Sequence, residues 1–254
     1  MLKKVFILTI VFLAIHNLNG QIINIEDKRV ALGDSIKFKG FGDLGVNFYR
    51  NDKQSMTLKA NIQLEYINRK HFFLCLSGFN LIRTSGVANT LNDGFTHVRY
   101  NYDLSKKWVY EAFMQGQYNE RTRVLFRGLM GTGVRLKLKL GKKQRYYIGL
   151  AYFLESNQFK DTTARQLDNR LSSYFSYNIN FGEKSRFVHT TYVQPRLDNW
   201  QNIRLSSEAS LLFVISKHLT FRTTFNTAYD SDPRLPESVP NWVYTLTNGL
   251  RFEF

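Results

Sequence analysis

The last fourteen residues of the chain, 241–254, alternate between apolar and polar side chains. This period of two predicts a β-strand with one apolar and one polar face. The strand ends on an aromatic residue at the carboxyl terminus. An outer-membrane β-barrel requires such a strand, because its last strand faces lipid on one side and pairs with the first strand to close the wall. The apolar positions, interrupted at Asn248, are Trp242, Tyr244, Leu246, Leu250, Phe252 and Phe254.

Residues 1–20 are predicted to be a secretory signal peptide, because a basic start precedes an apolar stretch at residues 5–15 and a small-residue exit at Gly20. The apolar stretch is too short to span a bilayer as a helix, and no other segment of the sequence qualifies as a membrane helix. We therefore expect cleavage after Gly20, a periplasmic lead-in over residues 21–39, and a barrel over residues 40–254.

Twelve segments of the remaining chain alternate in the same way. In one of them, apolar residues occupy every second position from Met56 to Tyr66. Strands over more than half of the mature chain are unusual for a soluble domain and expected for a barrel. The predicted fold is all-β, a transmembrane antiparallel up-and-down β-barrel of about twelve strands. The segments are 41–50, 55–68, 71–83, 94–104, 108–119, 123–140, 145–156, 168–181, 186–197, 202–215, 218–229 and 241–254.

The connections between these segments alternate in length. The long ones are residues 84–93, 157–167 and 230–240, and most of the intervening connections are short turns. Outer-membrane barrels have short periplasmic turns and long extracellular loops, which fits this order. Aromatic residues gather near both predicted rims, as expected for the two membrane interfaces. Those near the short-turn rim include Tyr66, Tyr100, Trp108, Tyr146 and Phe181, and those near the other rim include Tyr118, Tyr152, Tyr229, Trp242 and Tyr244.

The formal charge of the chain is +15, and loss of Lys3 and Lys4 with the leader reduces it to +13. Such a basic protein suits nucleic acid, an anionic lipid or glycolipid surface, or an anion-conducting lumen. Export makes nucleic acid the least suitable of these partners. The single cysteine, Cys75, leaves no thiol pair for a disulfide or a redox site and is expected to be a small apolar residue within a strand.

The polar face of the strands is predicted to line a lumen with more cations than acids. One interpretation is structural: a charge lattice in which each acid pairs with a neighbouring arginine and holds the wall. The other is functional: the surplus cations favour passage of anions. Barrel width decides between them, and twelve strands lie between a filled interior and an open channel. The predicted cations are Lys59, Arg99, Arg127, Arg135, Lys137, Lys139, Arg145, Arg170, Arg204, Arg222 and Arg251, and the acids are Asp43, Glu65, Asp103, Glu111, Glu155, Glu208 and Glu253.

Enzyme motifs are not recognisable in the sequence, so no catalytic residue, cofactor or metal is predicted. The histidines are scattered without metal-ligand spacing. His97 lies on the lumen face and could pair with a serine such as Ser206, but such a site also needs an orienting third group. The glycines at 128, 131 and 133 are expected to permit bending or close packing within their strand rather than ligand approach.

Several stretches resemble domain-of-unknown-function family 481, exported Gram-negative proteins of which some are described as putative salt-induced outer membrane proteins. The resemblance covers roughly residues 40–254 and is strongest after Tyr110, and the leader looks like the Bacteroidetes branch. It implies an outer-membrane barrel and supplies no functional residues. The stretches are Y-E-A-F-M-Q-G-Q-Y-N (110–119), R-G-L-M-G-T-G-V-R (127–135), R-L-S-S-Y (170–174), Y-V-Q-P-R-L-D-N (192–199), R-L-S-S-E-A-S (204–210) and Y-D-S-D-P-R-L-P-E-S-V-P (229–240).

These observations favour a passive channel or small-solute transporter with a basic lumen in the bacterial outer membrane. One alternative is an envelope-integrity barrel that contacts lipopolysaccharide. Another is a lipid-modifying enzyme whose active site the sequence does not reveal. Outer-membrane lipid, lipopolysaccharide, the barrel-assembly machinery and small anions are the expected partners. By resemblance to other outer-membrane proteins, the assembly machinery is expected to read Trp242, Tyr244, Leu250, Phe252 and Phe254.

Overall fold

The computed structural model describes most of the chain that follows the predicted leader. The predicted signal peptide and most of the lead-in lie outside the described residues, so their boundaries stay predictions. Among the described residues, no helix is long and apolar enough to cross a membrane. The described residues are 37–50, 53–86, 91–120, 122–140, 144–160, 164–182, 184–216, 219–232 and 240–252.

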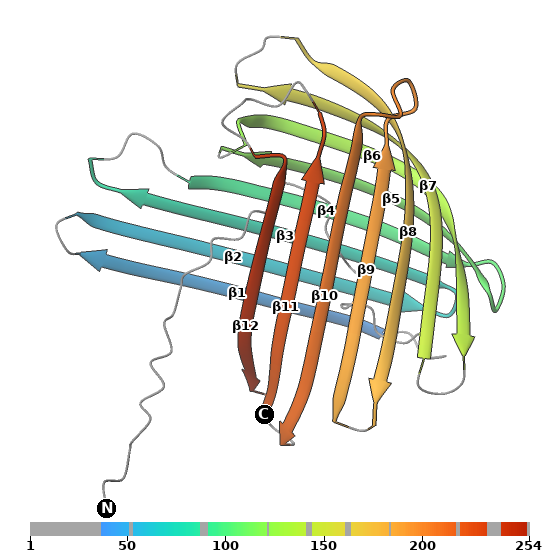
Figure 1. Cartoon of the computed structure of the whole chain (residues 1–254). Coiled ribbons are helices and arrows are strands. Elements are labelled where there is room, and N and C mark those ends of the chain that lie inside the picture. Colours follow the sequence, from blue (N-terminus) through green and yellow to red (C-terminus); the bar gives the residue numbers. More distant parts are fainter. Residues whose placement is uncertain are drawn as a thin grey trace, which may run out of the picture.

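The described residues form one antiparallel sheet of twelve strands in sequence order, and each strand pairs with the next along the chain (Figure 1). The predicted all-β, antiparallel, up-and-down architecture is therefore confirmed. The first strand begins at Lys37, inside the predicted lead-in. The strands are β1 Lys37–Arg50, β2 Gln54–Asn68, β3 His71–Thr84, β4 Leu91–Asp103, β5 Trp108–Asn119, β6 Val124–Leu140, β7 Gln144–Phe159, β8 Gln166–Phe181, β9 Ser185–Pro195, β10 Ile203–Ser216, β11 Leu219–Asp230 and β12 Trp242–Phe252.

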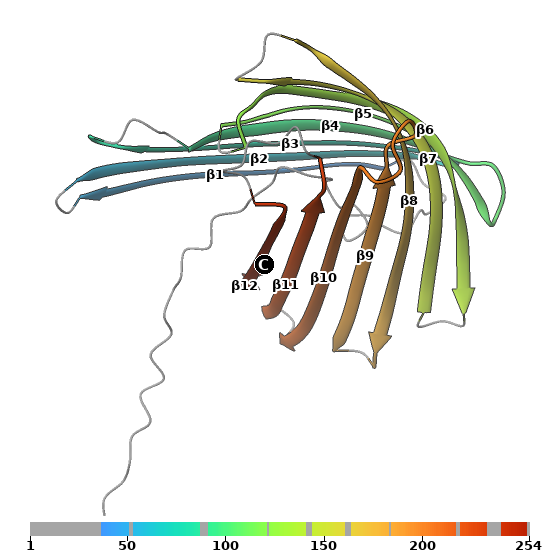
Figure 2. The ribbon, with the colours of Figure 1, turned by 45° about the horizontal axis from the view of Figure 1, so that its top comes forward.

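The sheet curls back on itself without closing. Figures 1 and 2 show β1–β5 as one arm, β8–β12 as the other, and a sharp bend at β6 and β7 between them. Among the described residues, β1 pairs only with β2 and β12 only with β11. Closure of the wall, which the terminal strand led us to expect, is therefore not seen. The two edges do not run side by side, and a ladder of backbone hydrogen bonds requires that they do.

Glycines make the bend possible, as the sequence predicted for two of them. A Cβ atom on Gly131 would lie 2.5 Å from Phe153 Cβ, and one on Gly133 would lie 2.3 Å from the Leu150 carbonyl oxygen. Such distances are far inside van der Waals contact. Gly131 and Gly133 therefore let β6 and β7 approach closely where the sheet turns, which is how curvature is introduced into strongly bent sheets.

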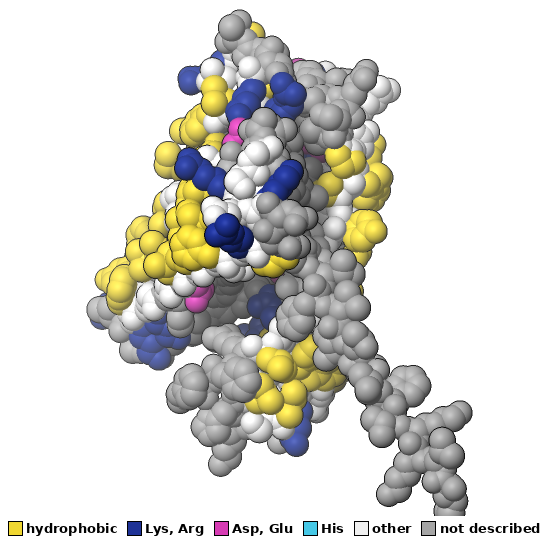
Figure 3. Space-filling model, turned by 90° about the vertical axis from the view of Figure 1, so that its left-hand side faces the viewer, with side chains coloured by type: hydrophobic (Ala, Val, Ile, Leu, Met, Phe, Trp, Pro, Cys, Tyr) yellow, Lys and Arg dark blue, Asp and Glu magenta, His cyan; other side chains and the backbone are white. Residues whose placement is uncertain are grey.

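The distribution of side chains is inverted relative to that of a water-soluble protein. Along β7, Ile148, Leu150 and Tyr152 are exposed, whereas Glu155 and Asn157 are buried. Polar and charged residues make up more of the buried set than apolar residues do. Figure 3 shows hydrophobic side chains along the flanks of the molecule and Lys or Arg side chains within the hollow between the arms. The concave face of the sheet is therefore polar, and the convex face is apolar.

Candidate functional site

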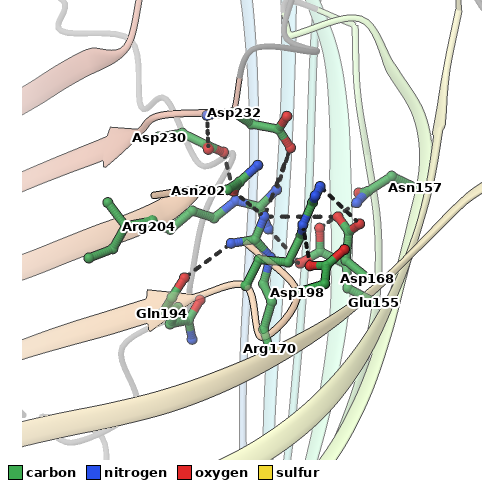
Figure 4. Close-up of polar contacts among 12 residues, drawn as sticks. Glu155, Asn157, Asp168, Arg170, Gln194, Asp198, Asn202, Arg204, Asp230 and Asp232 are labelled. Carbon is green, nitrogen blue, oxygen red and sulfur yellow. Dashed lines mark hydrogen bonds and ion pairs between the residues drawn. The ribbon is translucent and has the colours of Figure 1, made fainter. Parts of the chain in front are cut away.

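Arginines and carboxylates meet on the concave face, near the end of the sheet where the long connections lie (Figure 4). We call this group the arginine–carboxylate cluster. Strands β6 to β11 and the residues that follow β9 and β11 contribute to it. It contains four guanidinium groups and four carboxylates, and a fifth carboxylate, that of the exposed Asp198, pairs with Arg196 at 2.6 Å, so the cluster has no surplus of positive charge. The members are Arg127, Arg170, Arg196 and Arg204 with Glu155, Asp168, Asp230 and Asp232.

Arg204 of β10 is the central cation of the cluster. Its Nη1 donates to Glu155 of β7, and its Nε donates to Asp230 Oδ2 of β11 at 2.6 Å. Strands β7 and β10 are not neighbours, since β8 and β9 lie between them. The contact between Arg204 and Glu155 therefore crosses part of the interior and ties together strands that share no backbone hydrogen bonds.

Arg170 of β8 is completely buried. Its Nη1 donates to the Gln194 carbonyl oxygen at 3.1 Å, and its Nη2 donates to Asn202 Oδ1 at 2.8 Å. Carboxylate oxygens of Glu155, Asp168 and Asp232 each lie 3.9 Å from its nitrogens. Buried charge is tolerated only when it is paired and hydrogen-bonded, and Arg170 meets both conditions.

Arg127 of β6 completes the cluster on the side of the bend. Its Nε donates to Asn157 Oδ1 at 2.6 Å and lies 3.6 Å from Glu155 Oε1. Asn157 in turn donates to Glu155. Three guanidinium groups, those of Arg127, Arg170 and Arg204, therefore surround the carboxylate of Glu155. Glu155 is 1% exposed, so this carboxylate is the anionic centre of the cluster.

A second buried group surrounds Glu111 of β5, and we call it the Glu111 group. Arg99 Nη1 lies 3.6 Å from one carboxylate oxygen, and Arg135 Nε lies 3.5 Å from the other. The hydroxyl of Tyr174, a residue of β8, donates to Glu111 Oε2 at 2.8 Å. Strands β6 and β7 lie between β5 and β8 in the sheet. The two guanidiniums also lie over aromatic rings, Arg99 over Phe113 at 5.2 Å and Arg135 over Tyr147 at 4.8 Å. Two guanidiniums therefore share the carboxylate of Glu111 in this group.

A cavity of about 50 Å³ lies between the two groups. Its wall includes Arg99 and Glu111 on one side and Arg127, Glu155 and Arg204 on the other. A volume of this size holds a few water molecules rather than a solute. The side chains therefore fill the interior next to the bend. The wider space of the molecule is the hollow between the two arms (Figure 3).

The structure buries eight of the eighteen residues that the sequence assigned to the lumen and leaves three of them, Asp43, Lys59 and Arg145, exposed. Lys137 and Glu208 are partly buried and paired, Lys137 with Asp103 at 2.7 Å and Glu208 with Arg222 at 3.9 Å. The side chains of Lys139 and Arg251 lie outside the described residues. The fully buried members are Arg99, Arg127, Arg135, Arg170, Arg204, Glu65, Glu111 and Glu155.

Glu65 departs from the expectation that each lumen acid pairs with an arginine. One of its oxygens accepts a hydrogen bond from Gln63 at 2.5 Å, and the other has no hydrogen-bond partner among the described residues. The register places Leu74 of β3 on one side of Glu65 and Lys39 of β1 on the other, so no arginine lies directly opposite Glu65. Leu74 belongs to an apolar cluster with Ile67 and Phe72. The prediction was wrong at this position because the concave face of β3 is apolar.

The predicted assembly residues lie on or beyond β12. Trp242, Tyr244 and Leu250 are more than half exposed on the convex face. The side chain of Phe252 and the whole of Phe254 lie outside the described residues.

His97, the one histidine considered for catalysis, is buried on the concave face. Its Nδ1 hydrogen-bonds Gln115 Oε1 at 2.9 Å, and its ring stacks on Phe113. Among the described residues, no three His, Cys, Asp or Glu side chains are arranged to hold a metal ion.

Sequence reasoning missed the residues that complete the arginine–carboxylate cluster. Asp230 and Asp232 belong to a predicted loop, yet both are buried beside Arg204. A signal for them was present, because the family-like stretches 170–174, 192–199, 204–210 and 229–240 all contribute to the cluster. These segments, which are separate in the sequence, therefore lie close together in the structure. The other residues missed in this way are Asn157, Asp168, Gln194 and Asn202.

A family model described as "Protein of unknown function, DUF481" matches residues 42–247. The match names no bacterial branch, so the Bacteroidetes-like origin stays a prediction. No curated protein matches the chain.

Solved structures with related strand arrangements include a NanC porin, with a TM-score of 0.49 and 13% identity over 86% of this chain and 98% of that chain. OccK11 (OpdR) of Pseudomonas aeruginosa gives a TM-score of 0.39 and 8% identity over 85% and 80% of the two chains. The siderophore receptor PirA of Pseudomonas aeruginosa gives a TM-score of 0.42 and 14% identity over 88% of this chain and 47% of that chain.

Proposed function

This chain belongs to the DUF481 family of proteins of unknown function, and we propose that it is an outer-membrane β-barrel that conducts small solutes and favours anions. The observation that carries the proposal is the inverted distribution of side chains. Leu44, Met114 and Leu246 are exposed on the convex face, while Arg170 and Glu155 are buried on the concave face. An apolar exterior is stable against lipid and costly in water, whereas a polar interior suits a water-filled lumen.

The charges near the hollow support a preference for anions. The arginine–carboxylate cluster has no surplus of positive charge and offers anions no net attraction. The Glu111 group carries two guanidiniums, Arg99 and Arg135, against one carboxylate. A surplus positive charge on a low-dielectric wall concentrates anions near it. Selectivity is therefore expected to depend on the Glu111 group rather than on the larger cluster.

A closed barrel that supports envelope integrity is the second candidate. The contacts that favour it are those of Arg204 with Glu155 and of Tyr174 with Glu111, which tie non-neighbouring strands together across the interior. The cavity between them measures only about 50 Å³, which fits an interior filled by side chains beside the bend. In this case the loops and the basic rim would contact anionic lipopolysaccharide.

Recording from the purified protein in planar lipid bilayers separates the two candidates. If the protein is a channel, we expect stepwise conductance. Under a potassium chloride gradient, the reversal potential should lie towards the equilibrium potential of chloride. Arg99→Gln is expected to shift this potential towards zero, because it removes the local surplus charge. Lys106→Gln, in an exposed turn, is the matched control and should leave the potential unchanged. Absence of conductance steps, or a preference for potassium, would refute the anion channel.

Membrane placement is tested separately. The protein should sediment with outer membranes, require detergent for extraction, and show a folded band whose mobility changes on boiling. Release into the soluble fraction by salt alone would contradict the placement.

A further inference from the structure

Three polar side chains meet on the outer surface of β9 and β10. His189 Nε2 lies 2.9 Å from Ser207 Oγ and 3.2 Å from Thr191 Oγ1. The Thr191 hydroxyl donates to Ser207 Oγ at 3.1 Å. We call these residues the outer-face trio. All three are partly exposed, so a molecule in the surrounding phase can reach them.

The strand register places the trio on the convex, apolar face. Thr191 lies opposite Phe175 on one side and Ser207 on the other, and the same row continues through Thr227 to Tyr244. Residues directly opposite each other share one face of a sheet. Phe175 is 41% and Tyr244 is 74% exposed, so this row faces outward. In the proposed barrel, the trio faces lipid.

Two other hydroxyls on this face bond to backbone carbonyl oxygens, whereas the Ser77 and Tyr152 hydroxyls bond to the side chains of Thr96 and Asn169. Ser173 donates to the Val193 carbonyl oxygen, and Thr227 donates to the Val243 carbonyl oxygen. Such bonds are the usual way to place a hydroxyl against hydrocarbon, because an unsatisfied polar group there is costly. The outer-face trio differs from all of these in joining two hydroxyls to one imidazole.

The depth of the trio matches that of lipid ester groups. One row above it, Tyr229 and Trp242 lie side by side with ring centroids 4.9 Å apart. Tyrosine and tryptophan settle at the boundary between headgroups and acyl chains. The row of Ser207 lies two residues further along the strand, a distance of about 7 Å. Ester linkages of acyl chains lie just inside the headgroups, which is where this spacing puts Ser207.

We propose that the outer-face trio is a hydrolytic site for the ester-linked acyl chains of membrane lipids. The proposal rests on the proposed membrane placement and is independent of conduction. Ser207 is the nucleophile and His189 is its general base, because their polar atoms already lie within hydrogen-bond reach. The Thr191 hydroxyl, next to Ser207 Oγ, is the donor for the oxyanion.

The imidazole is oriented by aromatic rings. Tyr177 packs against it at 4.9 Å between centroids, and Phe187 is nearly parallel to it at 6.3 Å. Nδ1 has no hydrogen-bond partner among the described residues. Because no carboxylate of the described residues hydrogen-bonds Nδ1, turnover is expected to be slow, and trapping of the serine is the more sensitive readout.

The reaction proceeds through an acyl-enzyme. Ser207 Oγ attacks the ester carbonyl carbon while its proton passes to His189 Nε2. The bond between that carbon and the alkoxy oxygen then breaks, and the alcohol leaves with the proton from Nε2. Water next attacks the acyl carbon and gives a proton to His189. The fatty acid is released as Ser207 Oγ recovers this proton, so one ester and one water yield one alcohol and one acid.

The test uses the purified full-length protein in detergent micelles and in vesicles. A fluorophosphonate probe should label Ser207, and fatty acid should be released from vesicles of phosphatidylethanolamine and phosphatidylglycerol or from vesicles containing lipid A. Release from one of these assigns the source of the ester. p-Nitrophenyl butyrate, a water-soluble ester, reports the serine chemistry without a bilayer, and the heat-modifiable band reports membrane folding independently.

Ser207→Ala and His189→Ala should each lower the rate by more than about 100-fold, the usual scale for loss of acid–base assistance. Ser173→Ala removes a backbone-bonded hydroxyl from the same face and should retain the wild-type rate. A folded wild-type protein that is not labelled and cleaves no ester would overturn the proposal. So would cleavage that survives in Ser207→Ala.

Discussion

Glu155→Gln tests whether the arginine–carboxylate cluster holds the interior together. The substitution preserves shape but removes one of the negative charges that compensate the four guanidiniums. Arg204 loses a charge-assisted hydrogen bond, and the carboxylate that Arg127 and Arg170 approach at 3.6 and 3.9 Å becomes neutral. Because Glu155 is 1% exposed, solvent water cannot compensate the guanidinium charges that its carboxylate neutralised. Breaking a buried pair by removing one partner costs about 3–5 kcal/mol, and we expect a loss of unfolding free energy in this range.

Equilibrium unfolding in urea, with the protein folded in lipid vesicles, measures this loss. Glu120→Gln is the matched control, since Glu120 pairs with Lys160 at the surface and both side chains are about one-third or more exposed. Exposed pairs contribute about 0–1 kcal/mol. The reasoning is wrong if Glu155→Gln costs no more than Glu120→Gln.

Three further changes, two substitutions and one deletion, test separate parts of the structure. Gly149→Ala would place its Cβ 2.0 Å from the Tyr174 ring and should cost about 1–3 kcal/mol in the same unfolding assay, whereas Gly45→Ala meets nothing within 4 Å and should be neutral. Tyr174→Phe removes the hydrogen bond to Glu111 and should cost about 1.5–3 kcal/mol; an unchanged midpoint would show that the bond is not stabilising. Deletion of Phe254 should lower the amount of heat-modifiable protein in the outer membrane while secretion through the inner membrane continues, and undiminished assembly would contradict a terminal signal.

The strands were predictable because a strand with two different faces alternates apolar and polar residues along the sequence. Every expected segment contains an observed strand, and boundaries differ by no more than four residues, as at the start of β1. The face of each side chain followed from the same alternation. The concave face of β3 differs from the expectation of a polar wall. Phe72, Leu74 and Leu76 are buried there and make this face apolar.

Contacts across the interior were not predictable, because alternation assigns a residue to a face and says nothing about what lies opposite it in space. The pairing of Arg204 with Glu155 depends on how sharply the sheet bends between β7 and β10. Asp230 and Asp232 come from a predicted loop whose path depends on that bend. The open edge between β1 and β12 is likewise a property of accumulated twist, which no single strand encodes.

The central claim is that neighbouring residues of β12 face opposite environments, lipid on the convex side and water on the concave side. In a Cys75→Ser background, single cysteines introduced by Leu246→Cys and Thr247→Cys would carry a fluorophore on the protein reconstituted in vesicles. Adjacent strand residues point to opposite faces, and Leu246 is 45% exposed on the convex side. The account predicts that brominated lipid quenches the label at 246, while aqueous iodide quenches the label at 247. Quenching of both labels by the same phase would contradict an apolar exterior around a polar interior.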